Sequence, residues 1–188
     1  ENNYFLTVTG KKYLMELQPY EIQTGTTHKF KVAALALVVE RSNSSISVLY
    51  QVRRREPSRG AVEIVGGGIR RGESAADAAK RRLKEETGLE ATFAVLGSIR
   101  KTRFDQNGSL YSDIWYQVCG TETSVGMLQK ENSFGQNIWL SIDEALQVER
   151  TSGYGSKELA IQLSKLKSKT VNQLTCFFSE ETYNGNIA

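Results

Sequence analysis

The stretch GGIRRGESAADAAKRRLKEETGL, residues 67–89, constrains the fold more than any other part of the chain. It predicts a helix with well-marked ends that follows a glycine-rich turn. Ser74 is a suitable N-cap with Asp77 three residues later, and Gly88 favours termination after Thr87. A helix N-terminus beside exposed glycine backbone also favours a negatively charged ligand.

The predicted helix presents two stripes of side chains. At about 100° per residue, Ala76, Ala79 and Leu83 share a stripe that suits packing on a sheet. Glu85 and Glu86 lie on the neighbouring stripe and can point to a common site. Two carboxylates there suit Mg²⁺ or Mn²⁺, which prefer oxygen ligands and share a ligand's phosphates. The alternative is an ordinary solvated helix face, whose charges form weak ion pairs with nearby lysines and arginines.

Most other segments predict β-strands, and two further helices are expected near the end. Strands are expected at residues 4–17 (two short ones), 31–39, 45–54, 61–65, 93–100, 112–120 and 137–140, and helices at 141–148 and 156–167. The piece 61–65 runs directly into the glycine turn, and residues from 170 onward show no clear pattern. This order predicts an α/β (α+β) fold in which helices cover a mixed sheet.

Length and composition favour one globular domain over residues 1–188. Apolar residues make up 39% and charged residues 24%, and no apolar run is long enough to span a bilayer, so no membrane partner is expected. The net charge of +3 lacks a basic stripe with interleaved aromatics, which favours a small anionic ligand over a nucleic acid polymer. The N-terminal residues show neither a basic leader nor a signal-like core, so a cytoplasmic location is expected by default.

The residue types present exclude several catalytic chemistries. His28 is the only histidine, so no two-histidine metal motif exists and a serine triad would depend on this ring, for which a structural role is expected. Two cysteines are too few for a disulfide framework or a thiolate zinc site. Catalysis, if present, is expected to use carboxylates and a metal ion.

The segment 67–89 resembles the signature box of the Nudix hydrolases. That box is a glycine, five residues, Glu, seven residues, Arg-Glu, an apolar residue, one residue, Glu-Glu, one residue, Gly and an apolar residue. The matching positions are Gly67, Glu73, Arg81, Leu83, Glu85, Glu86, Gly88 and Leu89. Similarity extends to VEIVGGG and NIWLSIDEAL, so the resemblance covers about residues 32–148, with N-terminal strands in 1–31 and a C-terminal helix and tail in 149–188.

The resemblance implies a Nudix α/β/α sandwich with a loop-helix-loop box. It also implies Mg²⁺- or Mn²⁺-dependent hydrolysis of a nucleoside diphosphate linked to another moiety. Glu85 and Glu86 match the family's metal ligands, Arg81 matches the arginine that orients them, and Glu73 matches the glutamate that supports the loop. Divalent ions in such a site neutralise the diphosphate and acidify a water molecule.

Other residues are weaker candidates for the site. Gly67 and Gly68 would offer backbone groups to the ligand, and Glu63 lies just before them. Glu131 matches the late loop glutamate that some relatives use as a metal ligand or base; the alternative is a surface residue. Arg54 lies in QVRRREPSRG, which looks like the arginine-bearing strand of ADP-ribose and nucleotide-sugar hydrolases; the alternative is a solubilising basic edge.

Arg82 departs from the box, because the family has a glutamate that binds metal at this position. Three hypotheses follow: a hydrolase with weak or altered metal binding, a module that binds or senses a nucleotide without cleaving it, and a deliberate inactivating substitution. The arginine could also point away on its flexible stem. ADP-ribose or a nucleotide sugar is the favoured ligand class, a nucleoside triphosphate comes second, and the N-terminal strands could pair with a second copy to form a homodimer.

Overall fold

The computed structural model describes residues 30–56, 58–174 and 176–184, so His28 and nearly all of the expected N-terminal strand region lie outside the described residues. No helix within these ranges is long and apolar enough to cross a membrane. The elements in chain order are β1 (Phe30–Arg41), β2 (Ile46–Arg53), β3 (Val62–Glu63), β4 (Gly66–Gly68), α3 (Ala75–Thr87), β5 (Ala94–Phe104), β6 (Leu110–Thr121), β7 (Gly135–Ser141), α4 (Ile142–Thr151), α5 (Lys157–Lys165), the 3-10 helix η1 (Val171–Gln173) and β8 (Phe177–Asn184).

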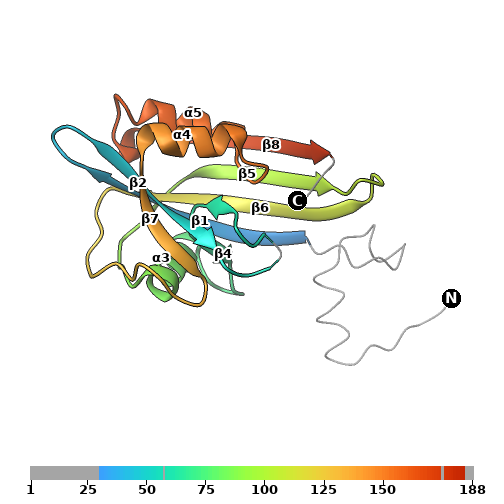
Figure 1. Cartoon of the computed structure of the whole chain (residues 1–188), viewed down its shortest axis with the longest axis horizontal. Coiled ribbons are helices and arrows are strands. Elements are labelled where there is room, and N and C mark those ends of the chain that lie inside the picture. The colour runs from blue at the N-terminus through green and yellow to red at the C-terminus, as the bar shows by residue number, and fades with distance from the viewer. Residues whose placement is uncertain (1–29, 57, 175, 185–188) are drawn as a thin grey trace.

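The strands form one mixed sheet, as the sequence predicts. Its order is β3-β2-β1-β6-β5-β8, while β4 also pairs with β1 and β7 also pairs with β2 (Figure 1). The pairs β1–β6 and β5–β8 are parallel, and the remaining pairs are antiparallel. The predicted hairpin is confirmed, since Val39 of β1 pairs with Val48 of β2.

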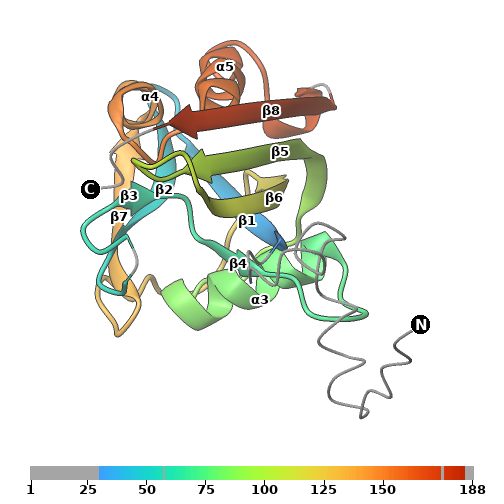
Figure 2. The same ribbon diagram turned by 90° about the vertical axis from the view of Figure 1, so that its right-hand side faces the viewer.

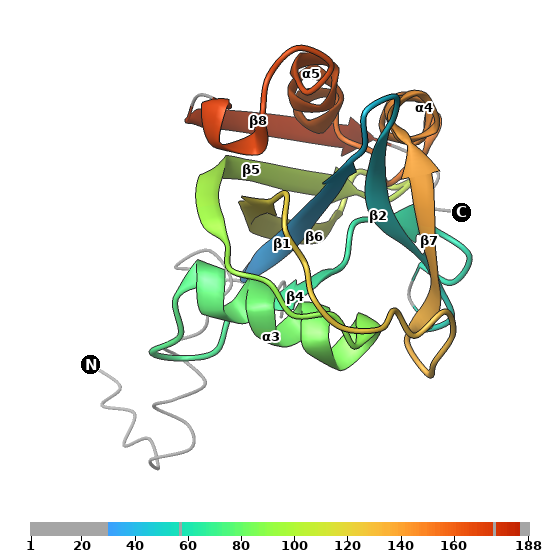
Figure 3. The same cartoon turned by 90° about the vertical axis from the view of Figure 1, so that its left-hand side faces the viewer.

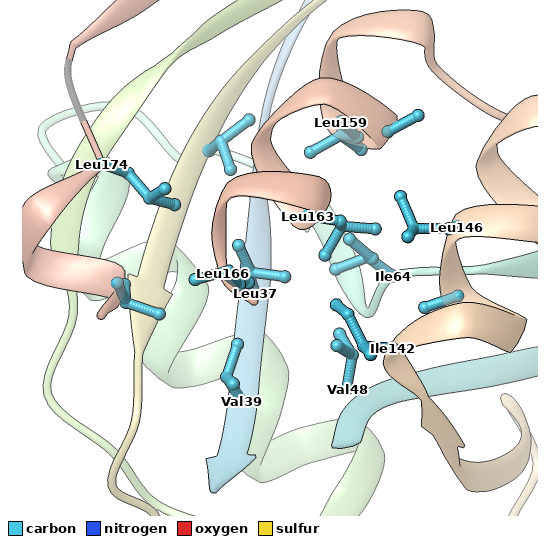
Figure 4. Close-up of a cluster of buried hydrophobic side chains, with 14 of the residues drawn as sticks. Leu37, Val39, Val48, Ile64, Ile142, Leu146, Leu159, Leu163, Leu166 and Leu174 are labelled. Carbon is cyan, nitrogen blue, oxygen red and sulfur yellow. The ribbon is translucent and has the colours of Figure 1, made fainter. Parts of the chain in front are cut away.

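Helices cover both faces of this sheet, with α3 on one side and α4 and α5 on the other (Figures 2 and 3). Under α3, small and apolar side chains such as Ala34, Ala79 and Leu83 form one buried cluster. Leu37 of β1 and Leu163 of α5 belong to a second cluster on the opposite face (Figure 4). The layered arrangement expected from the sequence is therefore present.

Local sequence signals set the ends of α3. The Ser74 hydroxyl accepts a hydrogen bond from the Asp77 amide at 3.1 Å, and Gly88 ends the helix with a left-handed φ of 76°. The buried stripe differs slightly from the predicted one, because Ala78 is fully buried while Ala76 is only partly covered. The tail from residue 170, which showed no pattern, forms η1 and then β8 beside β5.

The glycine triplet was expected to be a bare turn, and this prediction is wrong. Gly66–Gly68 form the short strand β4, antiparallel to β1, with Gly67 opposite Ala34. A Cβ at Gly66 would lie 2.6 Å from the Ala34 carbonyl oxygen. Glycine is therefore required by the close approach of two backbones rather than by a turn.

Candidate functional site

The loop before α3 is held by an ion pair between Glu73 and Arg81. The Nε and Nη2 atoms of Arg81 donate to the two Glu73 oxygens at 2.7 and 2.8 Å, and the Arg70 amide donates at 2.9 Å. The hydrogen bonds from Arg81 are the main reason that the pKa of Glu73 is lowered to about 2. Arg81 also donates to the Gly68 carbonyl at 3.1 Å. The pair thus ties the loop, the helix and β4 together.

Arg82 points into the site rather than away from it. Its Nε donates to the Gly66 carbonyl at 3.2 Å, and its Nη1 donates to Glu85 Oε2 at 3.1 Å. Its Nη2 forms an ion pair with Glu86 Oε1. The guanidinium also lies 5.3 Å from the centre of the Phe134 ring. These contacts hold the guanidinium between the two carboxylates of α3 (α3 and β4 are adjacent in Figure 2).

Gly67 leaves the space in which this arginine lies. A Cβ at Gly67 would overlap Arg82 Nε and would lie 2.9 Å from its Cδ and Cζ atoms. Any side chain at this position must therefore displace Arg82. The glycine was expected to expose its backbone to a ligand, and one side of that backbone is instead occupied by the arginine.

Glu86 is buried beside this cation, whereas Glu85 is partly exposed. Only 3% of Glu86 is accessible, and this burial raises its pKa to about 7, although the positive charges of Arg82 and Arg53 oppose the shift. The Glu86 Oε1 atom is paired with Arg82 Nη2 and has no other polar partner among the described residues. The two glutamates do converge on one point, and the Arg82 guanidinium is at that point.

The acidic residues expected to bind a metal do not form an open carboxylate cluster. Glu131, the third expected metal ligand, pairs with Arg54 in an exposed position, and Glu63, which was a candidate for substrate binding, pairs with Arg53 at 2.7 Å. Among the described residues, no group of three or more Asp, Glu, His or Cys is arranged to hold a metal ion. A divalent ion needs several free oxygen ligands. The residues present therefore do not fit such an ion while Arg82 holds the two α3 glutamates.

A cavity of about 380 Å³ lies on the other side of β4, against the sheet face that α4 and α5 cover. The three glycines of β4 separate this cavity from the group formed by Arg82, Glu85 and Glu86. The cavity is lined by basic and aromatic side chains, among them Lys31, Arg53, Lys101, Arg103, Tyr111, Tyr116 and Tyr154. Glu63 and Glu149 are its acidic residues. Such a lining suits an anionic ligand that carries a flat ring.

Sequence reasoning missed several residues of this cavity. Arg54 was the expected ligand-binding arginine, but Arg53 lines the cavity, because successive residues of a strand point to opposite faces. Lys101 and Arg103 were not considered. Ile99, Lys101 and Arg103 are spaced two residues apart along β5, and this spacing is the signal that could have placed both cations on the buried face.

Comparisons with known proteins agree with the fold. A profile of the NUDIX domain matches residues 29–159, a wider range than the expected 32–148. A MutT protein from Bacillus halodurans is 20% identical, with a TM-score of 0.63 over 82% of this chain and 90% of that one.

Two further structures share the fold at lower scores. The NUDIX domain of Shewanella oneidensis NrtR, complexed with ADP ribose, is 17% identical, with a TM-score of 0.57 over 87% and 100% of the chains. An Ap4A hydrolase from C. elegans is 17% identical, with a TM-score of 0.51 over 73% and 96%. No curated protein matches the sequence.

Proposed function

The chain belongs to the Nudix family, and from this premise we propose that it is a nucleotide-binding Nudix protein in which Arg82 suppresses hydrolysis. The proposed ligand is a nucleoside diphosphate derivative, with ADP-ribose or a nucleotide sugar as the favoured class. The proposal depends on one observation: the Arg82 guanidinium contacts both Glu85 and Glu86.

This contact opposes metal-dependent chemistry. Nudix hydrolases generally use divalent metal ions, which carboxylates hold beside the diphosphate. A divalent ion about 5 Å from the Arg82 guanidinium would be repelled by roughly 2 kcal/mol at the dielectric of water, and by more in a partly buried site. Arginine keeps its charge at every physiological pH. Hydrolysis is therefore expected to be slow or absent.

The cavity supports binding of a phosphorylated ligand. Arg53 lines it next to the β4 glycines, and the Arg53 Nε is buried with no hydrogen-bond partner among the described residues. A buried donor without an acceptor is costly, so a shift of the guanidinium that brings its Nε atom to a bound phosphate oxygen would be favoured. The shared fold with a NUDIX domain complexed with ADP ribose supports this ligand class.

A slow hydrolase is the second candidate, because the contacts that hold the loop of the box against α3 and β4 are intact. Glu73, Arg81 and Gly68 are joined by hydrogen bonds. If the long stem of Arg82 swings outward, Glu85 and Glu86 become available to an ion. ADP-ribose or a nucleotide sugar is the first substrate class for this activity, and a nucleoside triphosphate is the second.

Isothermal titration calorimetry with ADP-ribose separates the two candidates. The titration is done in EDTA and again in Mg²⁺ or Mn²⁺, with product analysis by chromatography. Binding in EDTA without product supports the proposed function. Binding that requires the metal, together with product, supports the slow hydrolase. Failure of ADP-ribose, UDP-glucose and ATP to bind under either condition would refute both candidates.

We further propose that residues 1–188 form one Nudix domain. The elements α5 and β8, which extend past the end of the profile match at residue 159, support this. Helix α5 packs with β1 in one core cluster, and strand β8 pairs with β5. Limited proteolysis would test it, because cleavage into two stable fragments is inconsistent with one domain.

A further inference from the structure

Two buried cations line the cavity on the far side from β4. Lys101 and Arg103 are two residues apart on β5, so both side chains face the cavity. Only 5% of Lys101 and 8% of Arg103 is accessible. Lysine and arginine are rarely buried to this extent unless they are paired with an anion.

The Lys101 and Arg103 cations make contacts that are polar or aromatic. The Lys101 Nζ donates to the carbonyls of Tyr154 and Gly155 at 2.9 and 3.1 Å. The Arg103 guanidinium lies 5.1 Å from the Tyr154 ring centre and 5.2 Å from that of Tyr183. Among the described residues, no carboxylate oxygen lies within 4 Å of either cation.

The two buried carboxylates nearby have other partners. Glu149 accepts hydrogen bonds from the Tyr50 hydroxyl at 2.8 Å and the Ser156 amide at 2.7 Å. Glu181 accepts from the Ser156 hydroxyl at 2.8 Å and also from Tyr183. The charges of Glu149 and Glu181 stabilise the Lys101 cation at longer range, but neither carboxylate forms an ion pair with Lys101 or Arg103, and both cations line the cavity. Burial lowers the pKa of Lys101, and a bound anion would oppose that shift.

The cation pair and the β4 glycines lie at opposite ends of the cavity. The strands β4, β1, β6 and β5 are successive neighbours, with Gly68 opposite Ala33 and Lys101 opposite Ile114. Three strand spacings of about 4.8 Å place β4 and β5 about 14 Å apart. Burial raises the pKa of Tyr116 on the intervening strand β6, and the positive charges of Arg103 and Arg53 both oppose this shift, so both cations lie within electrostatic reach of this residue.

We infer that Lys101 and Arg103 form a second anion-binding subsite, which receives a further phosphate on the ribose of the bound nucleoside diphosphate. This inference rests on the proposed function, in which the diphosphate lies at the β4 glycines and Arg53. The ligand class becomes a nucleoside diphosphate derivative with an additional phosphomonoester on the ribose. Tyr116, also in the cavity lining, offers an aromatic surface between the two anion sites.

Calorimetry in EDTA with matched probes tests the subsite. The probes are ADP, adenosine 2′-phosphate 5′-diphosphate and adenosine 3′-phosphate 5′-diphosphate, which differ only in the ribose phosphate. One of the two phosphorylated probes is expected to bind at least about tenfold more tightly than ADP, because hydrogen bonds between charged groups contribute more than neutral ones. This comparison uses the unchanged protein, so it does not depend on the folding of a variant.

Variants then test whether the gain in affinity over ADP comes from Lys101 and Arg103. In Arg103→Met the ratio of the affinity for the phosphorylated probe to the affinity for ADP is expected to fall to about one, and Arg103→Lys should keep part of the difference. Arg100→Met is the matched control, because Arg100 is on the same strand but pairs with Asp113 on the opposite face. The control should keep the full gain.

The outcomes separate the subsite from the proposed function. If ADP and both phosphorylated probes bind the unchanged protein equally, the subsite is refuted and the proposed function stands. If Arg103→Met is folded by circular dichroism and keeps the full gain, the assignment to these residues is refuted. If no nucleotide binds, both the subsite and the proposed function fail.

Discussion

Replacing Arg82 by glutamate should turn the site into a metal-binding one. When both glutamates are ionised, which for Glu86 requires a pH above its raised pKa of about 7, the side chains of Arg82, Glu85 and Glu86 carry a net charge of −1. Arg82→Glu changes this to −3. Two added negative charges about 5 Å from a divalent ion favour it by about 3 kcal/mol even at the dielectric of water. That corresponds to more than about 100-fold in affinity.

The assay is calorimetric titration of the chain and of Arg82→Glu with Mn²⁺. Lys80→Glu is the matched control, because it makes the same charge reversal at an exposed position on the same helix. The control should change Mn²⁺ affinity by no more than a few-fold, since an exposed charge is strongly screened. If folded Arg82→Glu binds Mn²⁺ no better than the control does, the electrostatic reasoning is wrong.

The same substitution should make stability depend on metal. Without Mn²⁺, Glu86 loses its cationic partner while it remains buried, at a cost on the order of 2 to 4 kcal/mol. For a domain of this size that lowers Tm by roughly 5 to 15 °C. Added Mn²⁺ should restore the Tm of the variant but leave that of the present chain unchanged, which calorimetric or fluorescence melting would record.

Three further predictions concern Gly67 and Glu73 of the box and Leu163 of the core. Gly67→Ala should displace Arg82 and lower stability by about 1 to 3 kcal/mol, measured by urea unfolding; an unchanged midpoint would show that the arginine can move freely. The lowered pKa of Glu73 means that its ion pair stabilises the fold above the ordinary glutamate pKa and loses this effect as pH falls towards about 2. Glu73→Gln should therefore be less stable than the present chain at pH 7, with the difference shrinking between about pH 4.5 and 2 in acid-unfolding curves; a difference that does not vary with pH contradicts this. Leu163→Ala should cost about 2 to 5 kcal/mol by urea unfolding, because Leu163 is fully buried between α5 and the sheet (Figure 4), and a loss below about 1 kcal/mol would contradict this packing.

Features with local causes could be predicted from the sequence. The limits of α3 depend on a hydroxyl at Ser74 and on the left-handed conformation of Gly88, and both act within a few residues. The hairpin of β1 and β2 likewise joins neighbouring segments. Periodicity and caps therefore placed these elements correctly.

Features that depend on distant segments could not be predicted. The glycine triplet becomes a strand only because β1 lies beside it, and the tail becomes β8 only because β5 offers an edge. The position of Arg82 depends on the space over Gly67, which the spacing of the box does not reveal. Lys101 and Arg103 become a candidate site only when α4, α5 and β8 enclose them.

The parallel pairing of β8 with β5 has a consequence for synthesis on the ribosome (Figure 1). The end of β5 at Phe104 precedes the start of β8 at Phe177, so roughly 4 to 15 s of translation separate them. During this interval the nascent chain already carries α3 and the whole box, while β5 keeps an open edge and Arg103 lacks the Tyr183 ring. The nascent chain therefore contains the complete box before the cavity is closed. Until β8 pairs with β5, the open edge of β5 is a place where incomplete nascent chains could associate.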